Sequence, residues 1–341
     1  MAAIIAQKGV VGFQVETTNG TEVAPDASDT VIVYDFTINT LAQAESLTRH
    51  PITPSFSMQT PIPGMQAGEC AFTLWMGGAT GTAPTVTPPW DVPFRACSWN
   101  VASSGSPVDT HTYTPSSAGA GGYDTATANE GKTHTVYAWI DGILYKLIGA
   151  TGNAKLILEV GQAVKAECTM QGAYAAPTST AVVASPTYKA SFVPPICTGA
   201  SVTYTPSGGS AHTSVLRSIE IDTAMSTILR KDMNSTPGII AAQNTNREPT
   251  FTMVVEQPAG AANSTTDLIW HTQFTAGTTA AISIGSIGST TGNQIDIDMP
   301  NVGLTNVEEG EEDGIRILTI TGTPAANSLV TGNDEISIAV T

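Results

Sequence analysis

Apolar and polar residues alternate with a period of two over most of this chain, as is typical of half-buried β-strands. The segment 30–40 places four large apolar side chains at every second position: Ile32, Tyr34, Phe36 and Ile38. The segment 70–76, CAFTLWM, is a second strand-like run around Phe72. These patterns predict a mainly β protein.

Two turn signals organise the middle of the chain. Asp141-Gly142 interrupts the β-rich segment 134–152, and this dipeptide favours a type I′ hairpin because both of its central positions need a positive φ. A second turn is predicted near Gly161-Gln162, within the segment 155–172. We therefore expect four strands that form a meander.

Helical patterns are scarce. Residues 88–99 and 267–274 have apolar side chains near helical spacing, and Pro88-Pro89 is a plausible helix start. Each half of the chain is thus expected to carry one short helix against a sheet. Glycine- and serine-rich segments are predicted to be loops that bury little: 77–88, 103–131 and 259–266.

The halves of the chain also resemble each other. The alignment rests on six matches: Ile38-Asn39-Thr40 with Ile221-Asp222-Thr223, Leu47-Thr48-Arg49 with Leu229-Arg230-Lys231, Glu69 with Glu248, Phe72-Thr73 with Phe251-Thr252, Trp90 with Trp270, and Gly172 with Gly322. We interpret this as one β-fold duplicated in tandem. The first copy spans 1–190 and the second 191–341, with a proline-bearing linker within 176–195.

Composition narrows the function. The 341 residues include 13 Lys and Arg against 29 Asp and Glu, a formal net charge of −16. Such a chain repels DNA and anionic membranes, so binding to either is excluded as a general mode. No apolar run is long enough for a membrane helix, and the N-terminus lacks the pattern of a signal peptide.

Motifs for catalysis, metal or cofactor binding are absent, and we predict no enzymatic activity, no metal and no cofactor. The five histidines are far apart, and the four cysteines are expected to be reduced, small core residues: His50, His111, His134, His212 and His271, with Cys70, Cys97, Cys168 and Cys197. Asp296 and Asp298 could form a carboxylate pair, but alternation favours a half-exposed strand with Ile295 and Ile297 inward. The acidic run 307–314 is expected to be a solvated turn between two strands.

A silent, acidic, duplicated β-chain suggests a structural subunit, and the order of its segments resembles a known family. The chain resembles the tail tube (major tail) proteins of long, non-contractile-tailed bacteriophages, the siphophages. The resemblance rests on three segments in this order: PWDVPFRACSW, then HTYTP, then YAWIDGILYKLIGATGNAKLILEVGQAVKAECTMQGAYAAP. ETTNGTEVAPDASDTVIVYDFTIN, the Arg49 segment and PIPG at 61–64 are similar to the N-terminal part of that family.

The resemblance implies a small β-barrel or sandwich with a flanking helix that assembles into stacked rings around a channel. It implies a virion protein, assembled in the bacterial cytoplasm, with a tape-measure protein, a tail terminator and a tip complex as partners. Single-domain members form hexameric rings, so a tandem copy allows either six chains or three. Heterologous contacts between covalently joined copies favour three, with pseudo-sixfold symmetry. The loops 42–68 and 224–247 are candidate arms for ring stacking.

The charge fits such a tube, because a channel for double-stranded DNA must not hold it. Seven acidic residues are candidates for the lining of the lumen: Asp296, Asp298, Glu308, Glu309, Glu311, Glu312 and Asp313. Two other classes stay open at this point. An extracellular β-sandwich adhesin or glycan-binding module has a similar composition, and a polysaccharide hydrolase is a third interpretation, although 6% aromatic residues hardly furnish its binding platforms.

Overall fold

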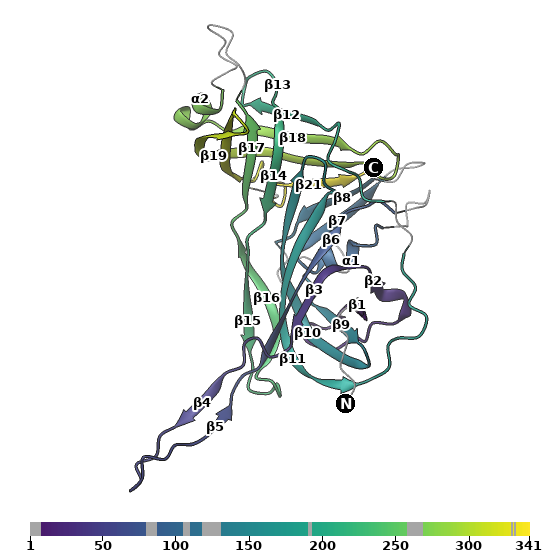
Figure 1. The fold of residues 1–341 in the computed structure, drawn as a ribbon, viewed down its shortest axis with the longest axis vertical. Helices are drawn as coiled ribbons and strands as arrows, with labels where there is room; N and C mark the ends of the chain where they lie inside the picture. Colours follow the sequence, from purple (N-terminus) through teal and green to yellow (C-terminus); the bar gives the residue numbers. More distant parts are fainter. Residues whose placement is uncertain are drawn as a thin grey trace.

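The computed structural model describes residues 8–79, 87–104, 110–117, 131–189, 193–257, 269–328, 330 and 332–341. Its described part is mainly β, with one large antiparallel sheet, two small two-stranded sheets and two short α-helices (Figure 1). The prediction of a mainly β fold with one short helix in each half is confirmed. A barrel within the single chain is wrong: among the described residues, the strand pairings branch at β10 and β19 and never close into a ring.

The first half contributes these elements: β1 (Gly9–Val15), a 3₁₀ turn (Ala27–Asp29), β2 (Thr30–Val31), β3 (Tyr34–Asn39), β4 (Ser46–Arg49), β5 (Gln59–Pro63), β6 (Ala67–Trp75), α1 (Asp91–Arg95), β7 (Trp99–Ser104), β8 (Thr110–Pro115), β9 (His134–Ile140), β10 (Ile143–Glu159) and β11 (Lys165–Ser179). The second half contributes β12 (Ser201–Pro206), β13 (His212–Thr213), β14 (Leu216–Asp222), β15 (Met225–Lys231), β16 (Ile239–Arg247), β17 (Thr250–Glu256), α2 (Ile269–Ala276), β18 (Ala280–Ile287), β19 (Ile295–Glu312), β20 (Ile315–Pro324) and β21 (Ser337–Val340).

The strands of the two halves are arranged in the same spatial order. In the first half the order is β2-β1-β9-β10-β11-β6-β3. In the second half it is β13-β12-β18-β19-β20-β17-β14, with each strand in the same place along the chain as its counterpart. The halves differ in the additions: the hairpin β7–β8 joins the second half through β21, which pairs with both β8 and β19.

Both hairpin predictions are confirmed, but the meander has three strands rather than four. Asp141 and Gly142 have the positive φ values, 44° and 91°, that the first turn needs, and Gly161 turns the second hairpin. The two expected middle strands are one, β10, because the glycines of the segment 149–152 are absorbed as a β-bulge between Ile148 and Thr151 instead of forming a turn.

The strand predicted over 30–40 is also interrupted. Asp35 adopts a φ of 50°, and a bulge separates the Tyr34–Thr73 pair from the Thr37–Ala71 pair. The bulge changes which residues face the core, so Ile32 and Tyr34 are exposed while Phe36 is half-buried. The predicted loops 77–88, 103–131 and 259–266, and the first two residues of the segment 267–274, lie largely or wholly outside the described residues. In the described part of 103–131 the loop prediction is wrong, because Thr110–Pro115 forms β8 and buries His111 and Tyr113.

One continuous antiparallel sheet runs across both halves, in the order β3-β6-β11-β10-β14-β17-β20-β19. The join is made by β10, which pairs with β9 up to Ala150 and with β14 from Lys155 onward. One face of this eight-stranded sheet is apolar and covered by the remaining strands and helices. A single hydrophobic core therefore extends through both halves.

Aromatic residues fill the core between the layers. Phe13 on β1 meets Phe72 on β6 with 5.2 Å between ring centroids, and Trp90 before α1 lies 4.7 Å from Tyr113. In the second half, Trp270 on α2 contacts Tyr204 at 4.0 Å. All four cysteines are free, and burial raises the pKa of the Cys70 and Cys168 thiols, which fits their predicted role as small core residues. No helix among the described residues is long and apolar enough to cross a membrane.

Glu16 stabilises the junction of β1, β9 and the β10 bulge from inside the protein. Its fully buried carboxylate accepts hydrogen bonds from the backbone N–H groups of Gly20 (2.6 Å) and Gly149 (2.7 Å) and from the hydroxyls of Thr133 and Thr135. Four donors compensate the cost of burying this charge.

We expect Glu16→Ala to lower the free energy of unfolding by about 3 kcal/mol, because buried donors that served a charged acceptor lose their partner. Urea unfolding at pH 7 measures the change. Glu45→Ala is the control, since Glu45 is exposed and its side chain makes no hydrogen bond with the described residues. Equal stability of the two variants would contradict the role given to Glu16.

The buried His134 makes stability depend on pH. Burial, assisted by the positive charge of Arg95, lowers the pKa of His134 to about 3. The unfolded chain takes up this proton near pH 6.5, whereas the folded chain stays neutral, so acidification favours unfolding. Between pH 6.5 and 4.5 we expect wild type to lose about 2–3 kcal/mol more than His134→Leu. Denaturant titrations at several pH values test this, and parallel pH profiles would refute it.

Candidate functional site: the polar face of the eight-stranded sheet

The second face of the eight-stranded sheet is polar and strongly acidic. On β6, β11, β14 and β17 its outward side chains alternate with buried ones, as Glu167 does with Ala166 and Cys168. Among the described residues, eight carboxylates lie on this face against four cationic side chains: Glu69, Glu159, Glu167, Glu220, Asp222, Glu256, Glu308 and Glu312 against Lys146, Lys155, Lys165 and Arg217. The face therefore repels anions, with local neutralisation where the cations lie.

Lys155 and Arg217 lie where the two halves meet. Lys155 on β10 is 2.6 Å from the carboxylate of Glu220 on β14, and this hydrogen bond raises the pKa of Lys155. Arg217 on β14 contacts Glu312 at 2.6 Å and Glu256 at 3.0 Å, and the bond to Glu312 raises its pKa. These exposed pairs contribute little stability individually. They offset the repulsion between carboxylates that the join brings together.

Hydrogen bonds of the uncharged Asn153 side chain fix the same join at the end of β14. The amide nitrogen of Asn153 donates to Asp222 (2.7 Å), while its amide oxygen accepts from the Thr223 hydroxyl (2.7 Å) and from the backbone N–H of Met225 (3.0 Å). Asn153 thereby holds the point at which the chain leaves β14 and enters β15, where Ala224 has a φ of 46°.

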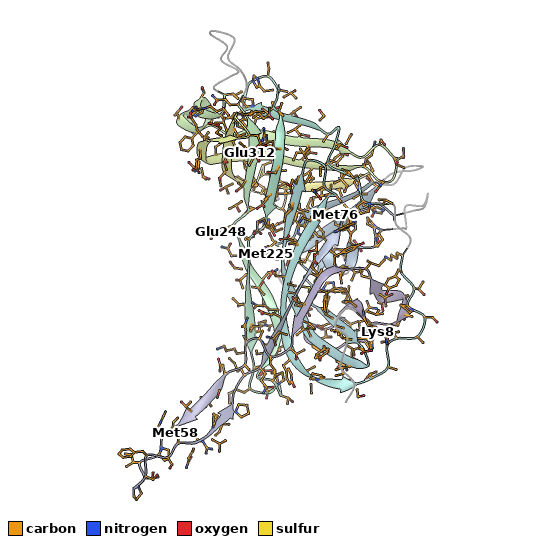
Figure 2. The ribbon with its side chains drawn as sticks, in the orientation of Figure 1. Lys8, Met58, Met76, Met225, Glu248 and Glu312 are labelled. Carbon is orange, nitrogen blue, oxygen red and sulfur yellow. The ribbon has the colours of Figure 1, made fainter. Side chains whose placement is uncertain are left out.

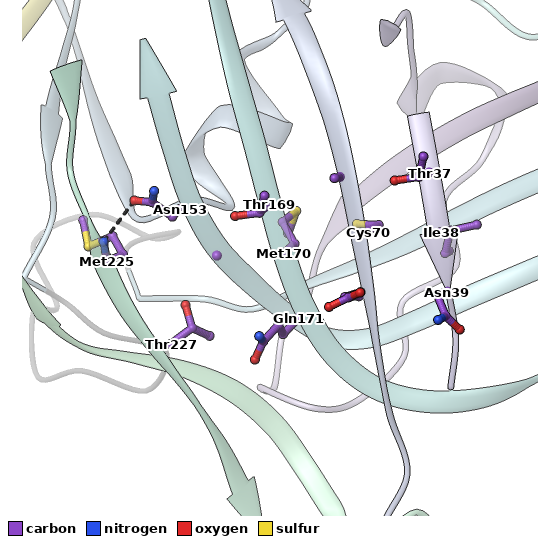
Figure 3. A pocket seen from close by; sticks show the side chains of 13 residues that line it. Thr37, Ile38, Asn39, Cys70, Asn153, Thr169, Met170, Gln171, Met225 and Thr227 are labelled. Carbon is purple, nitrogen blue, oxygen red and sulfur yellow. Dashed lines mark hydrogen bonds between the residues drawn. The ribbon is translucent and has the colours of Figure 1, made fainter. Parts of the chain in front are cut away.

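A groove of about 560 Å³ opens on this face between the sheet and β15. Figure 3 shows side chains of β3, β6, β11 and β10 on one wall and Met225 and Thr227 on the other, with the Asn153–Met225 hydrogen bond at one side. The polar lining is neutral apart from Glu69, with Asn39, Thr169 and Gln171 as its main hydrogen-bonding groups. Among the described residues no group of His, Cys, Asp or Glu could hold a metal ion.

The seven acidic candidates do not form one cluster. Asp296 and Asp298 lie near the start of β19, where the strand pairs with β18 and β21 rather than with β20. Ten residues separate Asp298 from Glu308, about 33 Å along a strand. Ile295 and Ile297 alternate with Asp296 and Asp298 along the strand and are fully buried, so the predicted half-exposed strand is confirmed.

The remaining five candidates surround the β19–β20 hairpin. Within the run 307–314, which was predicted to be a turn, only Asp313-Gly314 forms the turn, and 307–312 belong to β19. Glu308 and Glu312 fall on the polar face, opposite Thr319 and Ile315. Glu309 lies on the other side of the strand, opposite the buried Leu318, and its carboxylate contacts Arg316 and, at 3.3 Å, His271 on α2. Glu311 shares that side with Glu309, opposite Arg316.

Sequence reasoning missed most of the acidic residues that the structure gathers on one face. Glu69 and Glu167 stand alone in the sequence between uncharged neighbours, whereas Glu220 and Asp222 have the same spacing as the candidates Asp296 and Asp298. The available signal was alternation: each of these residues sits at a polar position of a half-buried strand. The order of strands, which brings them together, is set by long-range pairing.

No protein-family model matches the chain, and none of the curated proteins searched is similar to it.

Proposed function

We propose that this protein is the subunit of a siphophage tail tube, a structural virion protein that polymerises as stacked rings and forms the channel through which the genomic DNA is delivered. One observation carries the proposal: a single eight-stranded sheet with two unpaired edges and an acidic face, which the hairpin β15–β16 covers around Ala67 and Ala173. Rotational repetition of such a sheet closes it into a tube with the polar face inward.

The two edges of the sheet have the properties of contact surfaces. Among the described residues, β3 pairs only with β6, and β19 beyond Leu304 pairs only with β20. Exposed apolar side chains lie beside both edges: Ile32 and the stacked rings of Tyr34 and Trp75 at β3, and Ile315 at the tip of the β19–β20 hairpin. An unpaired edge flanked by apolar groups is a template for another strand. The antiparallel pairing of β10 with β14 within the chain is an example of the edge-to-edge contact that we propose between chains.

The common order of seven strands in each half supports the tandem duplication, and with it a ring of three chains. Joined copies 1–190 and 191–341 supply two of six equivalent positions from one chain. Three chains contribute 24 strands. If the strands are about 4.8 Å apart and tilted by about 40°, they close into a tube whose diameter, measured between opposite backbones, is roughly 48 Å. Six chains would give a channel roughly twice as wide, far beyond what a duplex needs.

The acidic face suits passage without retention. Cationic groups that neutralise phosphates add a salt-dependent binding free energy for each contact, and this would stall the DNA. The excess of carboxylates supports a lumen lined by this face. Glu308 and Glu312 belong to it, whereas a lumen role for Asp296, Asp298, Glu309, Glu311 and Asp313 stays a prediction that requires a second lining surface.

The proposal includes the other properties that the resemblance implies. The protein acts in the virion after assembly in the bacterial cytoplasm, and its partners are copies of itself, a tape-measure protein, a tail terminator and a tip complex. Of the two candidate stacking arms, 224–247 packs on its own chain, which leaves the hairpin β4–β5 as the free arm. No enzymatic activity and no cofactor are part of the proposal.

We expect the purified full-length protein to form rings and tubes with a central pore, and image averages along the axis to show threefold symmetry with six similar lobes. Negative-stain electron microscopy at increasing protein concentration tests this. Monodisperse monomers that bind a glycan would favour the adhesin class instead, and sixfold averages with six chains would overturn the trimer.

Reversing one charge on the polar face should convert repulsion into binding. In assembled tubes we expect Glu167→Lys, repeated in every subunit, to retain double-stranded DNA at low salt and to release it as salt rises. Asp298→Lys is the matched control, because the same charge change then lies where β19 pairs with β18 and β21, away from the polar face to which Glu167 belongs. Cosedimentation of tubes with short duplexes measures both. Retention by Asp298→Lys and not by Glu167→Lys would show that the lumen is lined by other residues.

A further inference from the structure

Two hairpins occupy equivalent places in the two halves. The hairpin β4–β5 connects β3 to β6, and β15–β16 connects β14 to β17. In each hairpin the matched leucine has an apolar residue across from it. Leu47 lies opposite Ile62, next to the base of the first hairpin, and Leu229 lies opposite Ala242, closer to the tip of the second. The sequence match of Leu47 with Leu229 therefore holds in the paired strands.

The second hairpin is docked on its own chain. Leu229 packs against a small apolar cluster of Ala67, Ala173 and Ile239, the first two contributed by β6 and β11. The amide nitrogen of Asn244 donates to the backbone carbonyl of Gly152 (2.8 Å) and to the Ser98 hydroxyl (2.6 Å). Both contacts tie the hairpin to the first half.

Glycine allows the docked hairpin to approach β10 closely. A Cβ atom on Gly149 would lie 2.7 Å from the Cα atom of Ala241, closer than a real side chain tolerates, and Gly149 also has a φ of 63°. Ala241 is consequently buried against the bulge of β10.

The first hairpin has no such contact. Leu47 and Ile62 keep 61% and 44% of their surface exposed, and Ile52 and Phe56 beyond them are fully exposed. Figures 1 and 2 show β4–β5 extending away from the body of the protein, with Met58 near its outer part. An apolar pair presented to water in this way is typical of an interface.

We propose that the base of β4–β5 docks sideways on the second half of a neighbouring copy of this chain, as β15–β16 docks on the first half of its own chain. The inference rests on the proposed function, because it uses the ring in which β3 of one copy pairs with β19 of the next. In the chain, β15–β16 lies beside β10 just where that strand leaves β9, at Ala150. β19 leaves β18 in the same way at Val302.

The strand pairs identify the receiving residue. Asn39 lies opposite Glu69, and Glu69 opposite Gln171, two positions before Ala173. In the second half Asp222 lies opposite Thr250, which precedes the Phe251–Gly322 pair. With Asn39 taken as equivalent to Asp222, the same steps along β20 place Ala325 where β11 has Ala173, two positions beyond the residue that the sequence match of Gly172 with Gly322 gives.

The surface around Ala325 is open and suited to a close approach. Ala325 and the neighbouring Thr323 are exposed, and no atom lies within 4 Å of the position that a Cβ on Gly303 would take. Asn306 is exposed, and its side chain forms no hydrogen bond with the described residues. The docking surface is thus small, polar at its edge and uncovered, as the site under β15–β16 would be without its hairpin.

Cysteine crosslinking tests the contact directly. We expect Leu47→Cys with Ala325→Cys, in a Cys197→Ser background and oxidised with diamide after assembly, to give dimers and closed trimers in denaturing gels that a reductant reverses. Each single cysteine variant is the control and should stay monomeric. Ladders longer than a trimer would overturn the closed ring of three, and their absence supports it.

A second measurement separates sideways docking from ring stacking. We expect Leu47→Ser with Ile62→Ser to raise the concentration for half-maximal ring formation by about tenfold. Ile52→Ser with Phe56→Ser, at the outer end of the same hairpin, should leave ring formation unchanged. If both pairs of variants form rings as wild type does and no crosslink appears, sideways docking is wrong and the tube stands. If wild type forms no rings, the proposed function itself fails.

Discussion

The pairing of β10 with β14 is the interaction on which the rest of the structure depends. A strand of 17 residues changes its partner halfway, so a half that would end in an open edge continues into the next half. The change is possible because the bulge at 149–152 turns β10 away from β9 without ending it. Asn153 then fixes the new neighbour through Asp222 and Thr223.

Continuity of the sheet also determines the chemistry of its exposed face. Burial of one face imposes alternation on the central strands, and the outward positions then assemble carboxylates that are far apart in the sequence. Lys155 and Arg217 reduce the repulsion at the join, where Glu220, Asp222 and Glu256 come closest to the first half. The same pairing that makes one core out of two halves therefore makes one acidic surface out of scattered residues.

Local features were predictable from the sequence, and long-range ones were not. The Asp141-Gly142 turn, the alternation around Ile295 and Ile297 and the two short helices follow from rules that act within about ten residues. The bulge in β10 and the positive φ of Asp35 were not predicted, because a glycine-rich or polar segment is compatible with either a turn or a bulge. The acidic candidates were divided between faces and sheets because strand order depends on pairings between distant segments, as for Glu167 beside Thr73.

The two hairpins show how one sequence pattern meets two different environments. Leu229 and Leu47 occupy the same position in equivalent hairpins, yet only Leu229 finds apolar partners, because β14 has β10 beside it in the same chain while β3 has nothing beyond its edge. An exposed Leu47–Ile62 pair gains nothing for an isolated subunit, and the hydrophobic effect favours covering it. A copy that supplies a strand to β3 also brings its own β19–β20 surface beside the hairpin. Edge pairing and hairpin docking are then a single geometric event, and neither requires a conformational change in the sheet.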